Sequence, residues 1–413
     1  MPIAAALYKV RIRDFALVTY ALIAFNVLMY LAISRGDPAS ILARFGLVPA
    51  APTLQTMFSS SFIHRDAPHL IGNMVFLWLF GRKVEQAMGA IEFLLLYIGG
   101  GFAASVMHVA IASAFFPPEW TKQAAVGASG PIAAVLGVFV IRFSRHKFYV
   151  GNAAIPALPV VFCWLLAQIL LGLLGLQLET LRLFGAAFTL RDVGYWAHVG
   201  GFIFGMGVAQ VTRMAIEGEK EYLRNDAQAS LRRGTLLEVV NKYEALLSYD
   251  PNDAFANAEL ARTWALLKDR EEAEHYYTRA AQLYLKKGLG DDALIRYDEL
   301  RRFWPDAGFH PETQFRLGCY LDEVGQYERA VGILGQVFLK HPGSAEAEMA
   351  MLKAGQIQLN RLSKAGLAAA ILAKFVDSYP QSEWLRFAEQ LLAKARERVE
   401  DQIPPWPDLT AER

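Results

Sequence analysis

Cysteine is nearly absent from this sequence. Cys163 and Cys319 are its only cysteines, and they lie in different halves of the 413 residues. This excludes a disulfide-stapled domain and a zinc site built on clustered cysteines. The histidines of the second half lack metal-ligand spacing, and that half has neither a phosphate-binding glycine loop nor a basic nucleic-acid stripe. We therefore expect no metal, no cofactor and no nucleic-acid partner.

Acidic residues are scarce in the first half of the chain. Residues 1–215 contain 15 Lys or Arg and only 8 Asp or Glu, a net charge of +7, whereas residues 216–413 contain 26 and 32, a net charge of −6. The whole chain is 54% hydrophobic. The sequence therefore predicts two domains in two different solvents, a lipid bilayer and water.

Long apolar runs fill the first half. A helix needs about 20 apolar residues to cross a bilayer core. Six runs predict crossings, and the second is the shortest of them: residues 15–33, 67–81, 93–116, 124–141, 149–178 and 193–212. The first run is too long for the core of a signal peptide and lacks a cleavage site after it.

Basic residues orient these six crossings. Clusters flank the runs at Lys9, Arg11 and Arg13, at Arg82 and Lys83, at Arg142, Arg145 and Lys147, and at Arg213. All of them fall on one side of the membrane if there are six crossings, and the positive-inside rule makes that side the cytoplasm. We therefore expect both termini in the cytoplasm of a bacterium, with the chain in its inner membrane and with Ser129 and His198 near the outer face.

Four polar side chains stand out in the apolar runs: His69, Asn73, Ser129 and His198. Such groups are costly in lipid and usually face a cavity or a partner. Each alone has a simpler structural interpretation, such as a hydrogen bond to its own helix or to a neighbouring one. Together they are more informative, because His69 and Asn73 share one helix face and Ser129 and His198 lie at matching depth.

Small residues at four-residue spacing accompany the serine and the second histidine. They are Ala133 and Gly137 after Ser129, and Ala197, Gly201 and Gly205 around His198. Such stripes let two helix backbones approach closely. Close approach is also what a hydrogen bond between serine and imidazole on two helices requires.

The chemistry that fits these residues is nucleophilic catalysis. Ser129 would be the nucleophile and His198 the base that takes its proton. The Asn73 amide, His69 and the Ser129 backbone N–H are candidate donors to an oxyanion, and Gly127 and Gly130 leave room for a substrate backbone. No acidic residue lies inside the runs and Asp192 is assigned to a loop, so we expect a dyad, not a triad.

Together with its ordered motifs, the sequence resembles the rhomboid intramembrane serine proteases. Four motifs occur in the order of that family: "FIHRDAPHLIGNM" at 62–74, "GRKVEQAMG" at 81–89, "GASG" at 127–130 and "AHVGGFIFG" at 197–205. The resemblance covers about residues 15–212. It implies a Ser129–His198 dyad, oxyanion support from His69 and Asn73, and cleavage of transmembrane substrates near the outer membrane face.

The sequence departs from the family pattern in three places. A Trp-Arg pair is missing from the first loop, Ala133 replaces an aromatic residue that stacks on the base in many members, and Pro131 follows the nucleophile motif. If Ala133 leaves His198 mobile, activity is low. Two alternatives therefore stay open: an inactive relative that binds transmembrane helices as a scaffold, and a channel or transporter, against which the four ordered motifs argue.

The second half carries a helical repeat. Pro305, Pro342 and Pro380 recur at intervals of 37 and 38 residues, and alanines open the expected second helices at 273, 293, 330 and 365. This pattern resembles tetratricopeptide repeats, with an extra helix expected in the longer interval after Pro251. The fold class is all-α: a six-helix bundle at 1–212, a helical linker at 213–233, a repeat solenoid at 234–400 and a tail at 401–413. We expect the solenoid to bind a protein or peptide.

Overall fold

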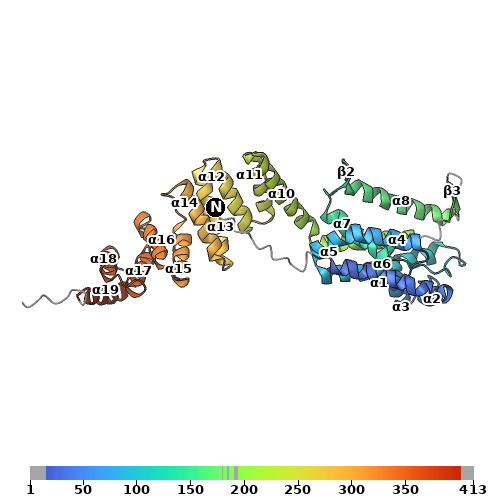
Figure 1. Ribbon diagram of the computed structural model, residues 1–413, viewed down its shortest axis with the longest axis horizontal. Coiled ribbons are helices and arrows are strands. Elements are labelled where there is room, and N and C mark those ends of the chain that lie inside the picture. The colour runs from blue at the N-terminus through green and yellow to red at the C-terminus, as the bar shows by residue number, and fades with distance from the viewer. Residues whose placement is uncertain (1–14, 179, 184–185, 190–193, 401–413) are drawn as a thin grey trace, which may run out of the picture. The chain divides into compact units, whose positions relative to one another are not determined.

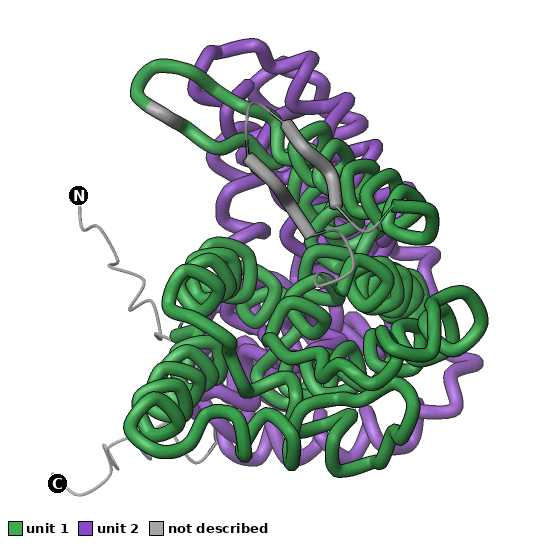
Figure 2. The backbone as a smooth tube through the Cα atoms, turned by 90° about the vertical axis from the view of Figure 1, so that its right-hand side faces the viewer, with its two compact units in different colours: residues 1–222 green, residues 223–413 purple. Residues whose placement is uncertain are grey.

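The computed structural model describes residues 15–178, 180–183, 186–189 and 194–400. Lys9, Arg11, Arg13, Asp192 and the predicted tail at 401–413 lie outside the described residues. The chain divides into two compact units, residues 1–222 and residues 223–413, coloured separately in Figure 2. The division falls inside α10 (Met214–Arg233), so the segment expected to link the two domains is helical.

The first unit consists of apolar helices and short hairpins, drawn from blue to green in Figure 1. Its helices are α1 (Leu17–Ser34), α2 (Pro38–Phe45), α3 (Leu54–Ser59), η2 (Ser60–Phe62), α4 (Ala67–Phe76), η3 (Leu77–Gly81), α5 (Arg82–Met88), α6 (Ala90–Phe115), α7 (Ser129–Arg142), α8 (Ala157–Gln177) and α9 (Tyr195–Val211). Two antiparallel hairpins flank α8: β1 (Lys147–Val150) with β2 (Ala153–Pro156), and β3 (Thr180–Leu183) with β4 (Ala186–Thr189).

All six apolar runs contain a helix, but the helices differ in their ability to cross a bilayer. Among the described residues, α1, α6 and α8 are long and apolar enough individually, and α9 qualifies only together with α10, from which it is bent by 68°. The 14 residues of α7 span about 21 Å, short of a hydrocarbon core of about 30 Å. Residues 130–139 of α7 are all buried, so this helix is enclosed by protein and not by lipid.

Three expected boundaries are wrong. The fourth helix begins at Ser129 and not at Ala124, because Ala125 pairs with Leu47 through two backbone hydrogen bonds of 2.9 and 3.0 Å. The fifth begins at Ala157, because the β1–β2 hairpin occupies the residues before it. The second does not end at Arg82. It continues through a π-helical turn and α5 to Gly89, whose φ of 107° ends it.

Helices α7 and α9 pack almost backbone to backbone. A Cβ placed on Gly201 would lie 2.2 Å from the carbonyl oxygen of Gly130, and one on Gly205 would lie 1.9 Å from that of Ala134. The contact advances four residues on both helices, so they run in the same direction and their N-terminal ends lie together. This confirms the close approach that the small-residue stripes predict.

Glu85 of α5 holds the start of α1. Its carboxylate accepts hydrogen bonds from the Val18 N–H at 2.9 Å, and from the Thr19 N–H and hydroxyl at 2.7 Å each. The side chain is only 2% exposed. A helix leaves its first N–H groups without intrahelical acceptors, and a carboxylate at that end satisfies them. Glu85 therefore ties α5 to the first helix of the bundle.

The second unit is an array of antiparallel helices, drawn from yellow to red in Figure 1. After the second half of α10 come α11 (Leu236–Tyr249), α12 (Ala254–Leu266), α13 (Arg270–Lys286), α14 (Gly290–Phe303), α15 (Pro311–Glu323), α16 (Tyr327–Lys340), α17 (Ala345–Asn360), α18 (Ala365–Ser378) and α19 (Leu385–Glu400). Pro251, Pro305, Pro342 and Pro380 all lie in turns between them. Three helices lie between the first two of these prolines and two in each later interval, which confirms the extra helix.

One packing contact recurs with the predicted period. A Cβ on Gly318 of α15 would lie 2.6 Å from the Leu334 side chain of α16, and a Cβ on Gly355 of α17 would lie 2.8 Å from Leu372 of α18. Both glycines and both leucines are buried. Each pair therefore packs a leucine of the second helix into a notch on the first, as expected of stacked repeats that share one core.

Candidate active site

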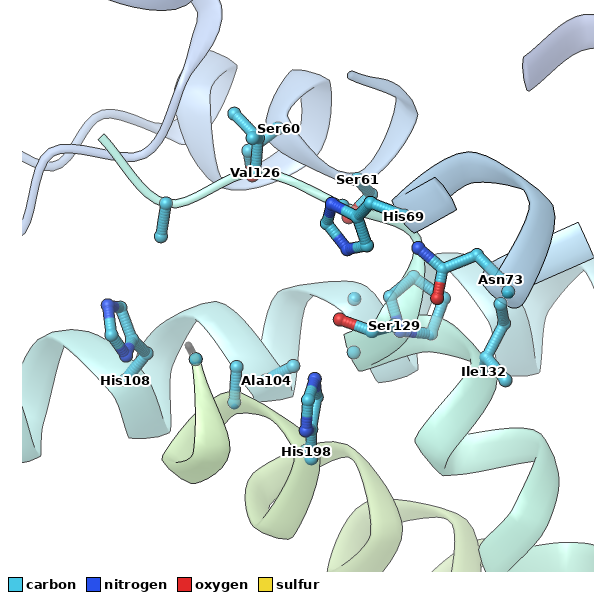
Figure 3. Close-up of a pocket in the computed structure, with 18 of the residues that line it drawn as sticks. Ser60, Ser61, His69, Asn73, Ala104, His108, Val126, Ser129, Ile132 and His198 are labelled. Carbon is cyan, nitrogen blue, oxygen red and sulfur yellow. The ribbon is translucent and has the colours of Figure 1, made fainter. Parts of the chain in front are cut away.

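A pocket of about 450 Å³ with several polar side chains in its lining opens in the first unit. Its lining includes Ser129, His198, His69 and Asn73, so the structure brings together all four side chains that the sequence singles out (Figure 3). They come from α7, α9 and α4. Ser129, His198 and His69 lie in the first turn, at the N-terminal ends of their helices, and Asn73 lies one turn after His69 on α4. These ends carry free N–H groups and a partial positive charge, which favours an anion.

Ser129 is the first residue of α7, and His198 is the fourth residue of α9. Both side chains are half-buried. In the view of Figure 3, Ser129 lies between His198 on one side and the His69–Asn73 pair on the other. The parallel packing of α7 and α9 produces this arrangement, because it brings the two helix starts to the same level.

Gly127 provides the space for His69 and Asn73 next to the serine. It has a φ of +132°, and a Cβ on it would lie 2.7 Å from Cε1 and 2.8 Å from Nε2 of His69, and 3.7 Å from Nδ2 of Asn73. Only glycine adopts this backbone conformation readily. Asn73 Nδ2 is buried and has no hydrogen-bond partner in the described part of the chain. A free amide donor therefore lies beside the segment that leads into Ser129.

The other three motif glycines differ in role. Gly130 lines the pocket, and its missing side chain admits α6, because a Cβ there would lie 2.6 Å from that of Ala104. Gly201 and Gly205 are not part of the pocket lining. They set the distance between α7 and α9 instead.

His64 holds the loop before Ser129, and sequence reasoning did not single it out. Its Nε2 accepts a hydrogen bond of 3.5 Å from the Ala128 N–H, and its ring lies 5.3 Å from that of His69. Burial, with a smaller contribution from His69, lowers the pKa of His64 to about 4. The ring is therefore neutral at pH 7 and can accept this bond. Its position in the motif at 62–74 was the available signal.

Two residues of α8 contact His198 and were also missed. Gln168 Oε1 lies 2.7 Å from His198 Nδ1, and the Trp164 ring lies 6.0 Å from the imidazole, tilted by 32°. Gln168 was detectable as an amide inside a long apolar run. Trp164 could not be assigned from sequence, because tryptophan is common in membrane helices.

Two family models match parts of the chain. A family model for the rhomboid domain matches residues 51–215, and one for the tetratricopeptide repeat matches residues 349–382. The chain therefore contains a rhomboid domain and a tetratricopeptide-repeat segment, and the rhomboid domain implies an integral membrane protein.

Individual relatives are distant. The chain is 29% identical to the zebrafish presenilin-associated rhomboid-like protein A, mitochondrial, over 36% of its own length and 35% of the relative's. It is 27% identical to the rhomboid protease GlpG of Haemophilus influenzae, over 46% of its own length and 87% of the relative's. The alignment with the crystal structure of the MamA protein covers 40% of this chain and 93% of the MamA chain, at 12% identity and a TM-score of 0.24. The chain covers between 35% and 58% of the first curated relatives.

Proposed function

We propose that this chain is an intramembrane serine endopeptidase that cleaves transmembrane proteins near the outer membrane face. The observation that carries the proposal is the single pocket lined by Ser129, His198, His69 and Asn73. Membership of a family that includes proteins named as rhomboid proteases supports it.

The proposed reaction begins when His198 removes the proton of the Ser129 hydroxyl, whose oxygen attacks the substrate carbonyl carbon. The negative charge on the carbonyl oxygen is stabilised by the Asn73 amide, His69 and the Ser129 backbone N–H. His198 then protonates the leaving amine as the peptide bond breaks. Water in the pocket hydrolyses the acyl-serine ester by the same steps in reverse order. Each step needs only groups of this chain, the substrate and water.

The repeat unit is proposed to bind a protein or peptide. It would recruit the cytosolic end of a substrate, bind a regulator or mediate oligomerisation. We place both termini in the cytoplasm, with the chain in a bacterial inner membrane, and keep the domain boundaries 1–212, 213–233 and 234–400. Reporter fusions at both termini test the orientation, and an external C-terminus would overturn the six-crossing topology.

The activity is tested with purified full-length protein, a reference transmembrane substrate and a fluorophosphonate probe. We expect cleavage and probe labelling in the wild type, and loss of both in Ser129→Ala and His198→Ala. Ser144→Ala is the matched control, because Ser144 is exposed and outside the pocket lining, and it should remain active.

The competing function is an inactive membrane scaffold. The observation in its favour is Ala133, which departs from the aromatic residue that the family pattern leads one to expect beside the base. A folded wild-type protein that neither cleaves the substrate nor labels at Ser129, yet retains it on an affinity column, would establish the scaffold and refute the protease.

A further inference from the structure

Gln168 is a buried amide in an otherwise apolar helix. It is 9% exposed and lies in the middle of α8, whose 18-residue apolar window is only 17% buried. An amide is costly in such a helix unless it has a hydrogen-bond partner. Its partner is the candidate base of the active site, since Gln168 Oε1 lies 2.7 Å from Nδ1 of His198.

This contact determines which ring nitrogen carries the proton. The Gln168 carbonyl oxygen can only accept a hydrogen bond, so His198 Nδ1 must donate. In a neutral imidazole the other nitrogen, Nε2, then has a free lone pair. Figure 3 shows one ring nitrogen of His198 directed toward Ser129 and the other away from it. Nδ1 bonds to Gln168, which is outside the pocket lining, so Nε2 faces the serine.

Trp164 contacts the same imidazole from one turn earlier on α8. Its ring lies 6.0 Å from that of His198, tilted by 32°. Helix α8 rests against the start of α9, where a Cβ on Gly172 would lie 3.3 Å from the Tyr195 side chain. Ala133 is fully buried and lies 3.3 Å from the point where a Cβ on Gly201 would be, so α7 leaves no space there for an aromatic ring.

We propose that Gln168 is the positioning residue for His198. It fixes the tautomer and orientation in which the base accepts the Ser129 proton, and Trp164 limits the tilt of the ring. Helix α8 thereby replaces the aromatic contact that Ala133 cannot make. This inference rests on the proposed protease function.

The first test compares probe labelling and substrate cleavage among variants of full-length protein. Gln168→Met keeps the side-chain length but removes the acceptor, and we expect both rates to fall by roughly 10- to 100-fold, the equivalent of one lost buried hydrogen bond. Gln168→Glu keeps an acceptor at the same position and should retain most of the activity. Gln177→Leu on the same helix is the control, because Gln177 is exposed, and it should match the wild type. If Gln168→Met does not fold, Gln168→Leu takes its place.

The second test does not depend on activity. Nitrogen-15 NMR of histidine-labelled protein, with the His198 signals assigned by their loss in His198→Ala, reports which ring nitrogen is protonated. We expect an Nδ1–H ring in the wild type and in Gln168→Glu, and a mixture of tautomers in Gln168→Met. An active wild type whose Gln168→Met variant keeps full activity and the same tautomer refutes the positioning role. If the wild type does not cleave the substrate but its His198 tautomer still depends on Gln168, the protease function is refuted and the effect of Gln168 on His198 is not.

Discussion

Gly205→Ala should lower the activity of the proposed active site, although Gly205 does not line its pocket. The new Cβ would lie 1.9 Å from the Ala134 carbonyl oxygen, 2.7 Å from its carbonyl carbon and 2.9 Å from its Cα. All three are backbone atoms, so no side chain can rotate away. An ordinary contact to such an oxygen is about 3.4 Å, and α7 and α9 must therefore separate by about 1.5 Å at this level.

That separation acts on the proposed catalytic pair, because Ser129 lies on α7 and His198 on α9. A misplacement of about 1 Å at reacting groups costs roughly 100-fold in rate. Overpacking a close-packed interface costs about 1–3 kcal/mol of stability. We therefore expect Gly205→Ala to fold with a lower melting temperature and to lose cleavage and Ser129 labelling by roughly 100-fold.

Gly207→Ala on the same helix is the matched control. It makes the same chemical change, but no atom lies within 4 Å of the new Cβ, and Gly207 is exposed. Labelling rate and melting temperature are measured for both variants in the same detergent. Wild-type labelling by a folded Gly205→Ala protein would refute the reasoning, because the glycine stripe would then not set the distance between serine and histidine.

Three further predictions concern single residues around the site and the bundle. Gly127→Ala should fold but lose more than about 100-fold in cleavage, because a Cβ at φ +132° would lie 2.7 Å from His69; a normal cleavage rate contradicts this. Glu85→Leu should lower the unfolding free energy by about 1–3 kcal/mol in a denaturant titration, since the Val18 and Thr19 N–H groups lose their acceptor, and Glu92→Leu, on an exposed carboxylate, should not. The pKa of His64 is lowered from 6.5 to about 4, so the unfolded chain binds more protons between these values and stability rises with pH across that window. Acidification from pH 7 to 5 should thus lower the melting temperature more in the wild type than in His64→Gln, and equal losses would exclude His64 as a cause.

The sequence was sufficient to single out four residues of the candidate site because polar side chains are energetically costly in apolar helices. A hydroxyl, two imidazoles and an amide stand out among leucines and alanines, and the motif glycines explain how the helices that carry them approach. The repeat was equally accessible, since proline turns and alanines recur along the chain at the period of the Gly318–Leu334 and Gly355–Leu372 contacts.

Other features depend on contacts that periodicity does not encode. Residues 124–127 are as apolar as a helix, yet they are not helical, and Ala125 pairs with Leu47 through two backbone hydrogen bonds. Gln168 could have hydrogen-bonded to any neighbouring helix, and only the packing of α8 against α9 selects His198. The length of an apolar run also does not say whether its helix faces lipid, and residues 130–139 of α7 are enclosed by the rest of the bundle.

The enclosure of α7 supports the proposed role of Ser129 as a nucleophile inside an apolar domain. A helix that faced lipid would need about 20 apolar residues, and its first turn would lie at the membrane surface. Helix α7 has only 14 residues and is buried along residues 130–139, and it begins directly after the non-helical segment at 124–128. Ser129 in its first turn therefore lines the pocket, where in the proposed reaction the free N–H groups of this turn would stabilise an oxyanion. Extending the helix N-terminally, by substituting Gly127 and Ala128 with leucine, should fill this space and abolish probe labelling even if the bundle still folds.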